Sequence, residues 1–206
     1  MGALQKLSDL IDMVSDWVGR LTMWLVLAAV LISAGNAIIR KVFSVSSNAY
    51  LEVQWYLYAA VFMLGAAYVL LHNGHVRIDF IASRLSKRTN AIIDAIGIVV
   101  FLIPLCLILI DLSWPYFMRT YLSGEMSENA GGLIRWPVVL LIPVGFGFLL
   151  LQGISELIKR VAFLTGARSE PFRYSEEKSV EEEIVEELSN ARVAAEGLLS
   201  PHETPK

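Results

Sequence analysis

The chain has 206 residues, 55% of them hydrophobic, and a mean hydropathy of +0.57. This composition is too apolar for one soluble domain, and the length is too short for an ordinary multi-helix transporter that is complete in itself. The net charge of −3 combines two unlike regions, because residues 1–168 hold 13 Lys and Arg against 10 Asp and Glu, whereas residues 169–206 hold 4 against 10. We therefore predict a small, mildly basic integral membrane protein with an acidic tail.

The N-terminal stretch is predicted to form one long helix. Its apolar residues recur at spacings of three and four from Leu4 to Leu21, which is typical of an amphipathic helix over residues 1–20. This helix continues into a first membrane span at about 21–39. From Leu4 to Ile39 it would be about 54 Å long at 1.5 Å per residue. Because a bilayer is thinner than that, we expect the helix to tilt, bend or project from the membrane.

A cleaved signal peptide is the competing interpretation of this stretch, because Gly35 and Ala37 are small residues after an apolar run. Three aspartates precede that run, however, where a signal peptide carries basic residues. The run also contains 19 uncharged residues, close to the length that a spanning helix needs. The sequence therefore favours a retained span.

Three more apolar stretches predict membrane spans, at about 53–71, 91–112 and 136–158. Pro104 lies near the middle of the third and is expected to kink its helix, because proline has no backbone N–H. Glycines in the fourth span are expected to allow neighbouring helices to approach closely. These glycines are Gly145, Gly147 and Gly153.

Two segments outside the spans differ in character. Residues 78–85 carry apolar side chains at helical spacing with charged residues on other faces, which predicts an interfacial helix. Residues 166–206 are rich in glutamate and are predicted to be an acidic cytoplasmic tail, partly helical or disordered. The predicted fold class is an all-α integral membrane protein, with four transmembrane helices in a membrane domain of residues 21–165, an amphipathic N-terminal extension, the interfacial helix and the tail.

Lys and Arg are shared unevenly between the two sides of this predicted bundle. The side with both chain termini has ten of them near the span ends, and the opposite side has four. Cytoplasmic segments are enriched in these residues. Both termini are therefore predicted to be cytoplasmic.

No recognisable catalytic or cofactor motif is present in the sequence. A nucleophile with a base, a Gly-rich phosphate loop and an HExxH-type zinc site are all missing, and the single Cys106 excludes an intrachain disulfide. His72 and His75 lie three residues apart at one interface, whereas axial haem ligands would come from facing helices. Surface hydrogen bonding and a pH-sensitive partner contact are the interpretations left open for them. We predict no enzyme activity, no cofactor and no metal site.

Ionisable residues near membrane spans are the usual indicators of function in such a protein. Glu52 is expected to pair with Arg40 or Lys41 across the first hairpin, or to favour a helix N-terminus through the dipole. Such structural pairing is favoured over direct contact with a transported ion.

Three further carboxylates near spans are Asp94, Asp111 and Glu156. The two aspartates are close enough to span ends to reach head groups or water, and Glu156 lies one helical turn from Gln152. No chain of carboxylates crosses the bilayer, and no pair of broken helices is repeated in two halves. The polypeptide is therefore not expected to move a solute alone.

Four fragments together resemble a known family. They are IIRKVF (Ile38–Phe43), Glu52, FMLGAAYVLLHNGHVRIDF (Phe62–Phe80) and GGLIRWPVVLLIPVGF (Gly131–Phe146). In this order, over about residues 15–165, the chain resembles the small membrane subunit of tripartite ATP-independent periplasmic (TRAP) transporters.

The resemblance implies a scaffold within a larger assembly in the bacterial inner membrane. In that family a large membrane subunit holds the sodium and substrate sites and uses the sodium gradient, with an elevator-like movement. A periplasmic substrate-binding protein delivers the substrate, typically an organic acid. The expected partners are these two proteins and membrane lipids, with no nucleic acid, and the expected role of the small subunit is scaffolding and docking.

The same resemblance supplies candidate partner or structural contacts, without any catalytic role. The first-hairpin pattern matches Arg40, Phe43 and Glu52, and the second-span pattern matches Gly65, Ala66 and His75. Arg77 and Asp79 follow in the same stretch. Small residues of the second span are expected to permit tight helix packing against a partner or within the bundle.

Two alternative functions come from other classes. A self-associating small channel would need a polar stripe through at least one span, and the polar residues in the spans are too scattered to form one. An anchor subunit of a membrane redox complex is the other alternative, which a haem spectrum would reveal.

Overall fold

A computed structural model of the chain describes residues 2–44, 47–72, 85–168 and 188. The chain divides into two compact units, residues 1–173 and 174–206. The helices of the first unit, in chain order, are α1 (Gly2–Phe43), α2 (Asn48–Leu71), α4 (Lys87–Gly97), the π-helical stretch η1 (Ile98–Leu102), α5 (Ile103–Ser123) and α6 (Trp136–Leu164). The interfacial helix predicted at 78–85 lies outside the described residues except for Leu85, as does the tail beyond Arg168 except for Leu188.

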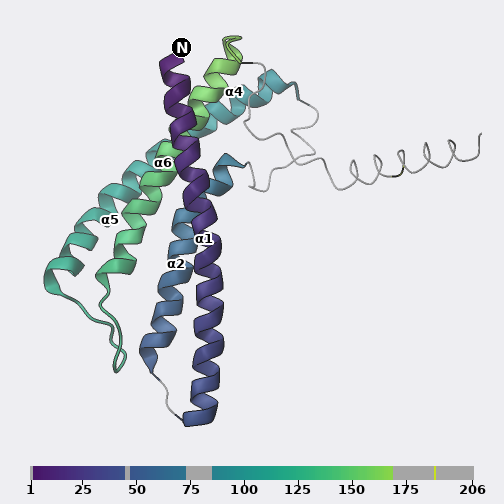
Figure 1. Ribbon diagram of the computed structural model, residues 1–206. Coiled ribbons are helices and arrows are strands. Elements are labelled where there is room, and N and C mark those ends of the chain that lie inside the picture. The colour runs from purple at the N-terminus through teal and green to yellow at the C-terminus, as the bar shows by residue number, and fades with distance from the viewer. Residues whose placement is uncertain (1, 45–46, 73–84, 169–187, 189–206) are drawn as a thin grey trace, which may run out of the picture. The chain divides into compact units, whose positions relative to one another are not determined.

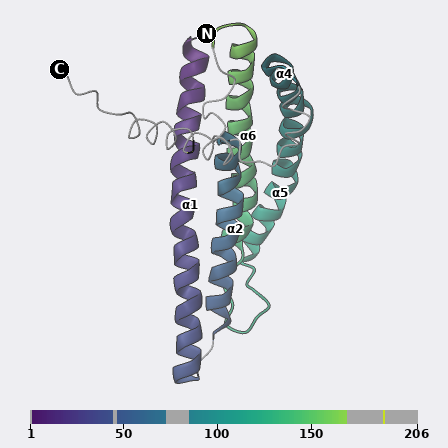
Figure 2. The same ribbon diagram turned by 90° about the vertical axis from the view of Figure 1, so that its right-hand side faces the viewer.

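Helix α6 is the central element of this unit. It packs against α1, α2, α4 and α5, while α1 and α2 lie side by side along the lower part of α1 (Figures 1 and 2). Within its most apolar stretch, 33% of the residues are buried, against 11% in each of the other long helices. The core of the unit therefore lies along α6.

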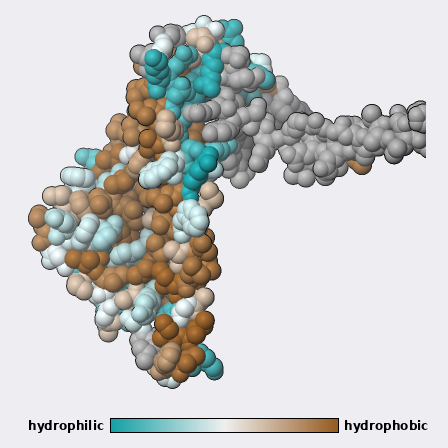
Figure 3. All heavy atoms as spheres, in the orientation of Figure 1, coloured by the Kyte–Doolittle hydropathy of each residue, from teal (hydrophilic) through white to brown (hydrophobic). Residues whose placement is uncertain are grey.

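Four helices of this unit are long and apolar enough to cross a membrane, which confirms the predicted fold class. The described residues contain no strand beyond a single bridge between Met126 and Ile134. On the face seen in Figure 3, hydrophobic side chains cover the middle of the helices, and hydrophilic ones gather toward the end that holds α4. A continuous helix satisfies its own backbone hydrogen bonds, which is what the interior of a bilayer requires.

The third membrane-crossing segment runs without a break from Lys87 to Ser123, past the residue 112 at which the apolar run ends. The π-helical stretch η1 directly precedes Ile103 and Pro104, and the backbone N–H of Ile103 bonds to the Ile98 carbonyl. A π-helical turn places its hydrogen bonds one residue further along, which accommodates the missing proline donor. The segment ends at Gly124, whose φ of 61° is left-handed.

Glycines mark three of the close helix contacts. A Cβ at Gly145 of α6 would stand 2.8 Å from the Met63 carbonyl of α2, and one at Gly153 would stand 2.7 Å from Leu102. A Cβ at Gly147 would meet no atom within 4 Å, so this third glycine of α6 does not serve close packing within the chain. A side chain at Gly19 of α1 would overlap the ring of Tyr68, a close approach that the sequence did not indicate.

Candidate functional site

A line of polar residues runs along the inner face of α6, an otherwise apolar helix. Gln152, Ser155, Glu156 and Lys159 follow one another at spacings of three, one and three residues, which keeps them on one face. All four are buried, and Gln152 and Ser155 have no exposed surface at all. Buried polar groups must find partners within the protein.

The partner of this line is Asp12 of α1, which is itself 1% exposed. The Lys159 Nζ lies 3.2 Å from Asp12 Oδ1 and 3.1 Å from Oδ2. Ser155 Oγ and Gln152 Nε2 donate to Asp12 Oδ1 at 2.7 and 3.0 Å. One turn earlier, the hydroxyls of Ser8 and Ser155 lie 2.7 Å apart. These contacts fasten the first part of α1 to the end of α6.

Glu156 extends the interactions toward α4. Its carboxylate accepts from both Lys159 Nζ and Arg160 Nη1. The Arg160 Nε in turn donates to Asp94 Oδ2 of α4 at 3.3 Å. We call the five ionisable residues Asp12, Asp94, Glu156, Lys159 and Arg160 the charge cluster. It joins three helices at one end of the bundle, and its alternation of carboxylate and cation keeps each buried charge next to an opposite one.

A second set of contacts closes the opposite end, where the loop 124–135 folds over the start of α2. Glu52 is 3% exposed, and its carboxylate accepts hydrogen bonds from three residues of this loop. Oε1 accepts from Ser127 Oγ and, at 2.8 Å, from Asn129 Nδ2. Oε2 accepts from the Leu133 backbone N–H at 2.6 Å. We call Glu52 and these three partners the Glu52 clasp.

The backbone of the loop 124–135 folds so that the three partners of Glu52 lie close together. Ser127 N–H donates to the Leu133 carbonyl at 2.9 Å, which closes the loop into a narrow hairpin. Gly132 lies inside it, because a Cβ there would stand 2.6 Å from Ser127 Cβ and 2.8 Å from Glu52 Oε1. Tyr56 Oη donates to the Ile134 carbonyl at 3.0 Å, one helical turn beyond Glu52. The loop is therefore held within the first three turns of α2.

The contact residues predicted from the sequence differ in their burial and in their partners. Glu52 is committed to the loop rather than to Arg40 or Lys41, both of which are exposed at the end of α1. Phe43 is 68% exposed. Gly65 and Ala66 are half-buried, and a Cβ at Gly65 would meet no atom within 4 Å, so Gly65 marks no close helix contact among the described residues. The remaining candidates are His75, Arg77 and Asp79, which lie outside the described residues.

His72 and the aspartates expected near head groups also have defined positions. The His72 Nε2 lies 3.7 Å from Asp16 Oδ1, and Asp16 also pairs with Arg20 at 2.9 Å. Asp94 pairs with Arg160 in the charge cluster, whereas Asp111 is exposed. The proximity of Gln152 and Glu156 is confirmed, with a hydrogen bond of 3.2 Å.

Sequence reasoning missed the burial of Asp12 and the role of Lys159. A signal was present, because Ser8, Asp12 and Ser15 form a narrow polar stripe at helical spacing, and all three are at most 2% exposed. A stripe of short polar side chains between leucines fits an internal contact as well as a solvated face. The cation that pairs with Asp12 is Lys159 of α6, and the sequence does not show that these parts of α1 and α6 lie together.

One of the comparisons with known proteins found a match, to a family model. The model of the family described as "Tripartite ATP-independent periplasmic transporters, DctQ component" matches residues 29–163. No curated protein and no solved structure matches the chain. The match covers α2, α4, α5, nearly all of α6 and the last part of α1 from residue 29 on, and so includes Glu52 and the part of the charge cluster on α4 and α6.

Proposed function

The chain belongs to the DctQ component family of tripartite ATP-independent periplasmic transporters, and from this premise we propose that it is the fixed scaffold of the assembly in a bacterial inner membrane. As a DctQ component it is the small permease subunit of a TRAP transporter and a multi-pass membrane protein. The finer proposal is that it supports a large subunit which carries the sodium and substrate sites and moves against it during uptake of an organic acid. The family is a transporter component rather than an enzyme family.

The observation that carries the scaffold role is the charge cluster. A support for a moving subunit must not bend with it, and ion pairs buried between three helices resist separation because each helix would leave charges behind. Four of the five ionisable side chains are at most 3% exposed, so solvent screens them little. The remainder of α1 presents large exposed apolar side chains that suit lipid or a partner helix.

The Glu52 clasp supports a docking role at the other end. We place the loop 124–135 in the periplasm and both chain termini in the cytoplasm, in agreement with the distribution of Lys and Arg. The clasp holds the loop in one conformation while Met126, Glu128 and Asn129 remain exposed. A preformed surface loses little conformational entropy when a partner binds. A periplasmic binding protein is the partner that we propose for it.

The scaffold proposal is tested with the large subunit and the binding protein reconstituted in proteoliposomes, with and without this chain. An imposed sodium gradient should drive uptake of labelled organic acids, compared across a panel of mono- and dicarboxylates. Uptake should require the chain, the sodium gradient and the binding protein. Equal uptake by the large subunit without the chain would refute the scaffold role, and uptake that persists without sodium would refute the coupling.

The docking proposal is tested separately with Glu128→Lys, which reverses one charge on the exposed loop. The concentration of binding protein that gives half-maximal uptake should change several-fold, because charges at the rim of an interface act mainly on encounter. Lys41→Glu, a charge reversal at the exposed end of α1, serves as the matched control. Unchanged dependence on the binding protein in Glu128→Lys would place docking elsewhere.

A further inference from the structure

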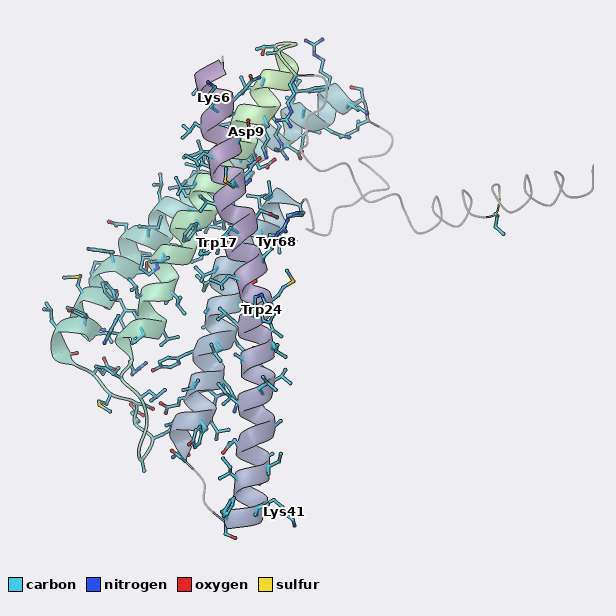
Figure 4. The ribbon with its side chains drawn as sticks, in the orientation of Figure 1. Lys6, Asp9, Trp17, Trp24, Lys41 and Tyr68 are labelled. Atoms are coloured by element: carbon cyan, nitrogen blue, oxygen red, sulfur yellow. The ribbon has the colours of Figure 1, made fainter. Side chains whose placement is uncertain are left out.

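A small cavity lies beside the charge cluster, between the first turns of α1 and the end of α6. Its volume is about 250 Å³. Gln5, Ser8 and Asp9 line it from α1, and Lys159 and Arg168 line it from α6 and the residues that follow. Asp9 lies on the upper part of α1, with Lys6 nearer the chain terminus (Figure 4). Sites for drug-sized ligands begin at about 300 Å³, so the cavity suits a group smaller than a whole metabolite.

The polar groups that line the cavity fall into two sets. Ser8 bonds to Ser155, and Lys159 is held by the carboxylates of Asp12 and Glu156. Gln5, Asp9 and Arg168, by contrast, make no hydrogen bond or ion pair with another residue in the part of the chain that the structure describes. Among the described residues, the cavity therefore offers one guanidinium, one carboxylate and one amide that bond to no other residue.

The surroundings of the cavity favour a lipid over a soluble ligand. Leu4, Leu7 and Leu10 alternate along α1 with the lining residues and are 47–55% exposed. Ile158 and Lys159 of α6 line the cavity, next to the predicted end of the fourth span at 158. Arginine beside a span end is a common contact for phosphate head groups. A headgroup in the cavity would leave its acyl chains free to run along the exposed leucines.

We propose that this cavity binds the headgroup of a phospholipid that carries both a phosphate and a primary ammonium, as in phosphatidylethanolamine. Arg168 and the Gln5 amide donate to the phosphate, and the Asp9 carboxylate accepts from the ammonium. The charges of Arg168 and Asp9 are opposite, so together they match a zwitterion better than an anion. A primary ammonium also supplies N–H donors to Asp9, which the methylated ammonium of phosphatidylcholine lacks.

The test is native mass spectrometry of the purified full-length chain in detergent. Three phospholipids with matched acyl chains are added in turn, with ethanolamine, glycerol or choline headgroups, and soluble phosphoethanolamine is the fourth probe. Phosphatidylethanolamine should bind most tightly. Arg168→Gln should weaken binding of all three lipids about fivefold, the scale of one solvent-accessible ion pair. Asp9→Asn should remove the preference for the ethanolamine headgroup and leave the other two lipids unchanged.

Lys6→Gln is the matched control, because Lys6 is exposed on the same helix and does not line the cavity. It should bind all lipids as the unaltered chain does, and thermal unfolding should show that each variant is folded. Tighter binding of phosphatidylglycerol would overturn the proposal in favour of a purely anionic site. Phosphoethanolamine binding as tightly as the lipid would overturn the lipid assignment. An unchanged headgroup preference in Asp9→Asn would overturn the role of the carboxylate.

Discussion

The Lys159 ammonium lies 3.1 Å from the Asp12 carboxylate, although 147 positions separate the two residues in the chain. Neither side chain is more than 1% exposed, so the pair is shielded from water and salt. Glu156, one turn earlier on α6, shares the same ammonium. The arrangement fixes the N-terminal part of α1, which precedes the apolar run of the first span, to the central helix of the bundle.

Lys159→Met should be the most destabilising change in the charge cluster. The Asp12 carboxylate would stay buried and lose the ammonium that lies against both of its oxygens, which costs about 3–5 kcal/mol in comparable buried pairs. Thermal unfolding in detergent, followed by circular dichroism, measures this loss. Arg20→Met is the control, because it also removes a cation from an aspartate of α1, but the Arg20 side chain is 68% exposed and its loss should cost less than about 1 kcal/mol.

A double variant tests whether the charge itself is responsible. Asp12→Asn removes the carboxylate charge, so adding it to Lys159→Met should recover part of the lost stability. The two substitutions share one contact and should therefore be strongly non-additive. If the double variant loses as much as the sum of the two single variants, the Lys159 ammonium does not neutralise Asp12.

Glu52→Gln should loosen the loop 124–135 despite the similar shape of the two side chains. The partners from Ser127, Asn129 and Leu133 are all donors, so the new amide NH₂ would face a donor. We expect a loss of about 1–3 kcal/mol in local stability. Hydrogen exchange measures it directly, as faster exchange of the Leu133 backbone N–H.

The control for the clasp is Glu125→Gln in the same loop. Glu125 pairs with Arg135, but both side chains are 38% exposed, so the exchange rates should change little. Equal acceleration in the two variants would mean that the loop is stabilised by its own hairpin contacts rather than by Glu52.

Gly145→Ala and Gly147→Ala form a matched pair on α6. The new methyl group at 145 would meet the Met63 carbonyl and Cβ of α2, each at 2.8 Å, whereas the one at 147 would meet nothing within 4 Å. Overpacking of this kind costs about 1–3 kcal/mol, while Ala is favoured over Gly in an open helix position by up to about 1 kcal/mol. Gly145→Ala should therefore lower the unfolding temperature and Gly147→Ala should not. Similar behaviour of the two variants would contradict the close approach of α2 and α6.

Gly65→Leu tests the predicted contact with the large subunit. A Cβ at this position would meet no atom of the described residues within 4 Å, so the stability of the isolated chain should change little. Co-purification with the large subunit should fall, because small residues allow close packing of membrane helices. Unchanged recovery of the complex would remove Gly65 from the interface.

The all-α class and the four spans could be predicted from the sequence because apolar runs of about 20 residues are a local property. The hydrogen-bond partners of Glu52 could not be predicted from the sequence. Arg40 and Lys41 were the nearest cations in the chain, yet the carboxylate binds a loop some 75–81 residues further on. Backbone N–H groups and hydroxyls are uncharged, so a search of the sequence for opposite charges does not find them as partners of a carboxylate.

The sequence by itself determined that this chain lies in a membrane, how many times its described helices can cross it, and which family it belongs to. The tertiary structure decided which of its polar residues are internal. Asp12 and Asp9 lie on the same amphipathic helix, three residues apart, yet one is buried against Lys159 and the other lines a cavity. Helical periodicity places residues on faces of a helix, and the packing of α6 decides which face meets protein and which remains open.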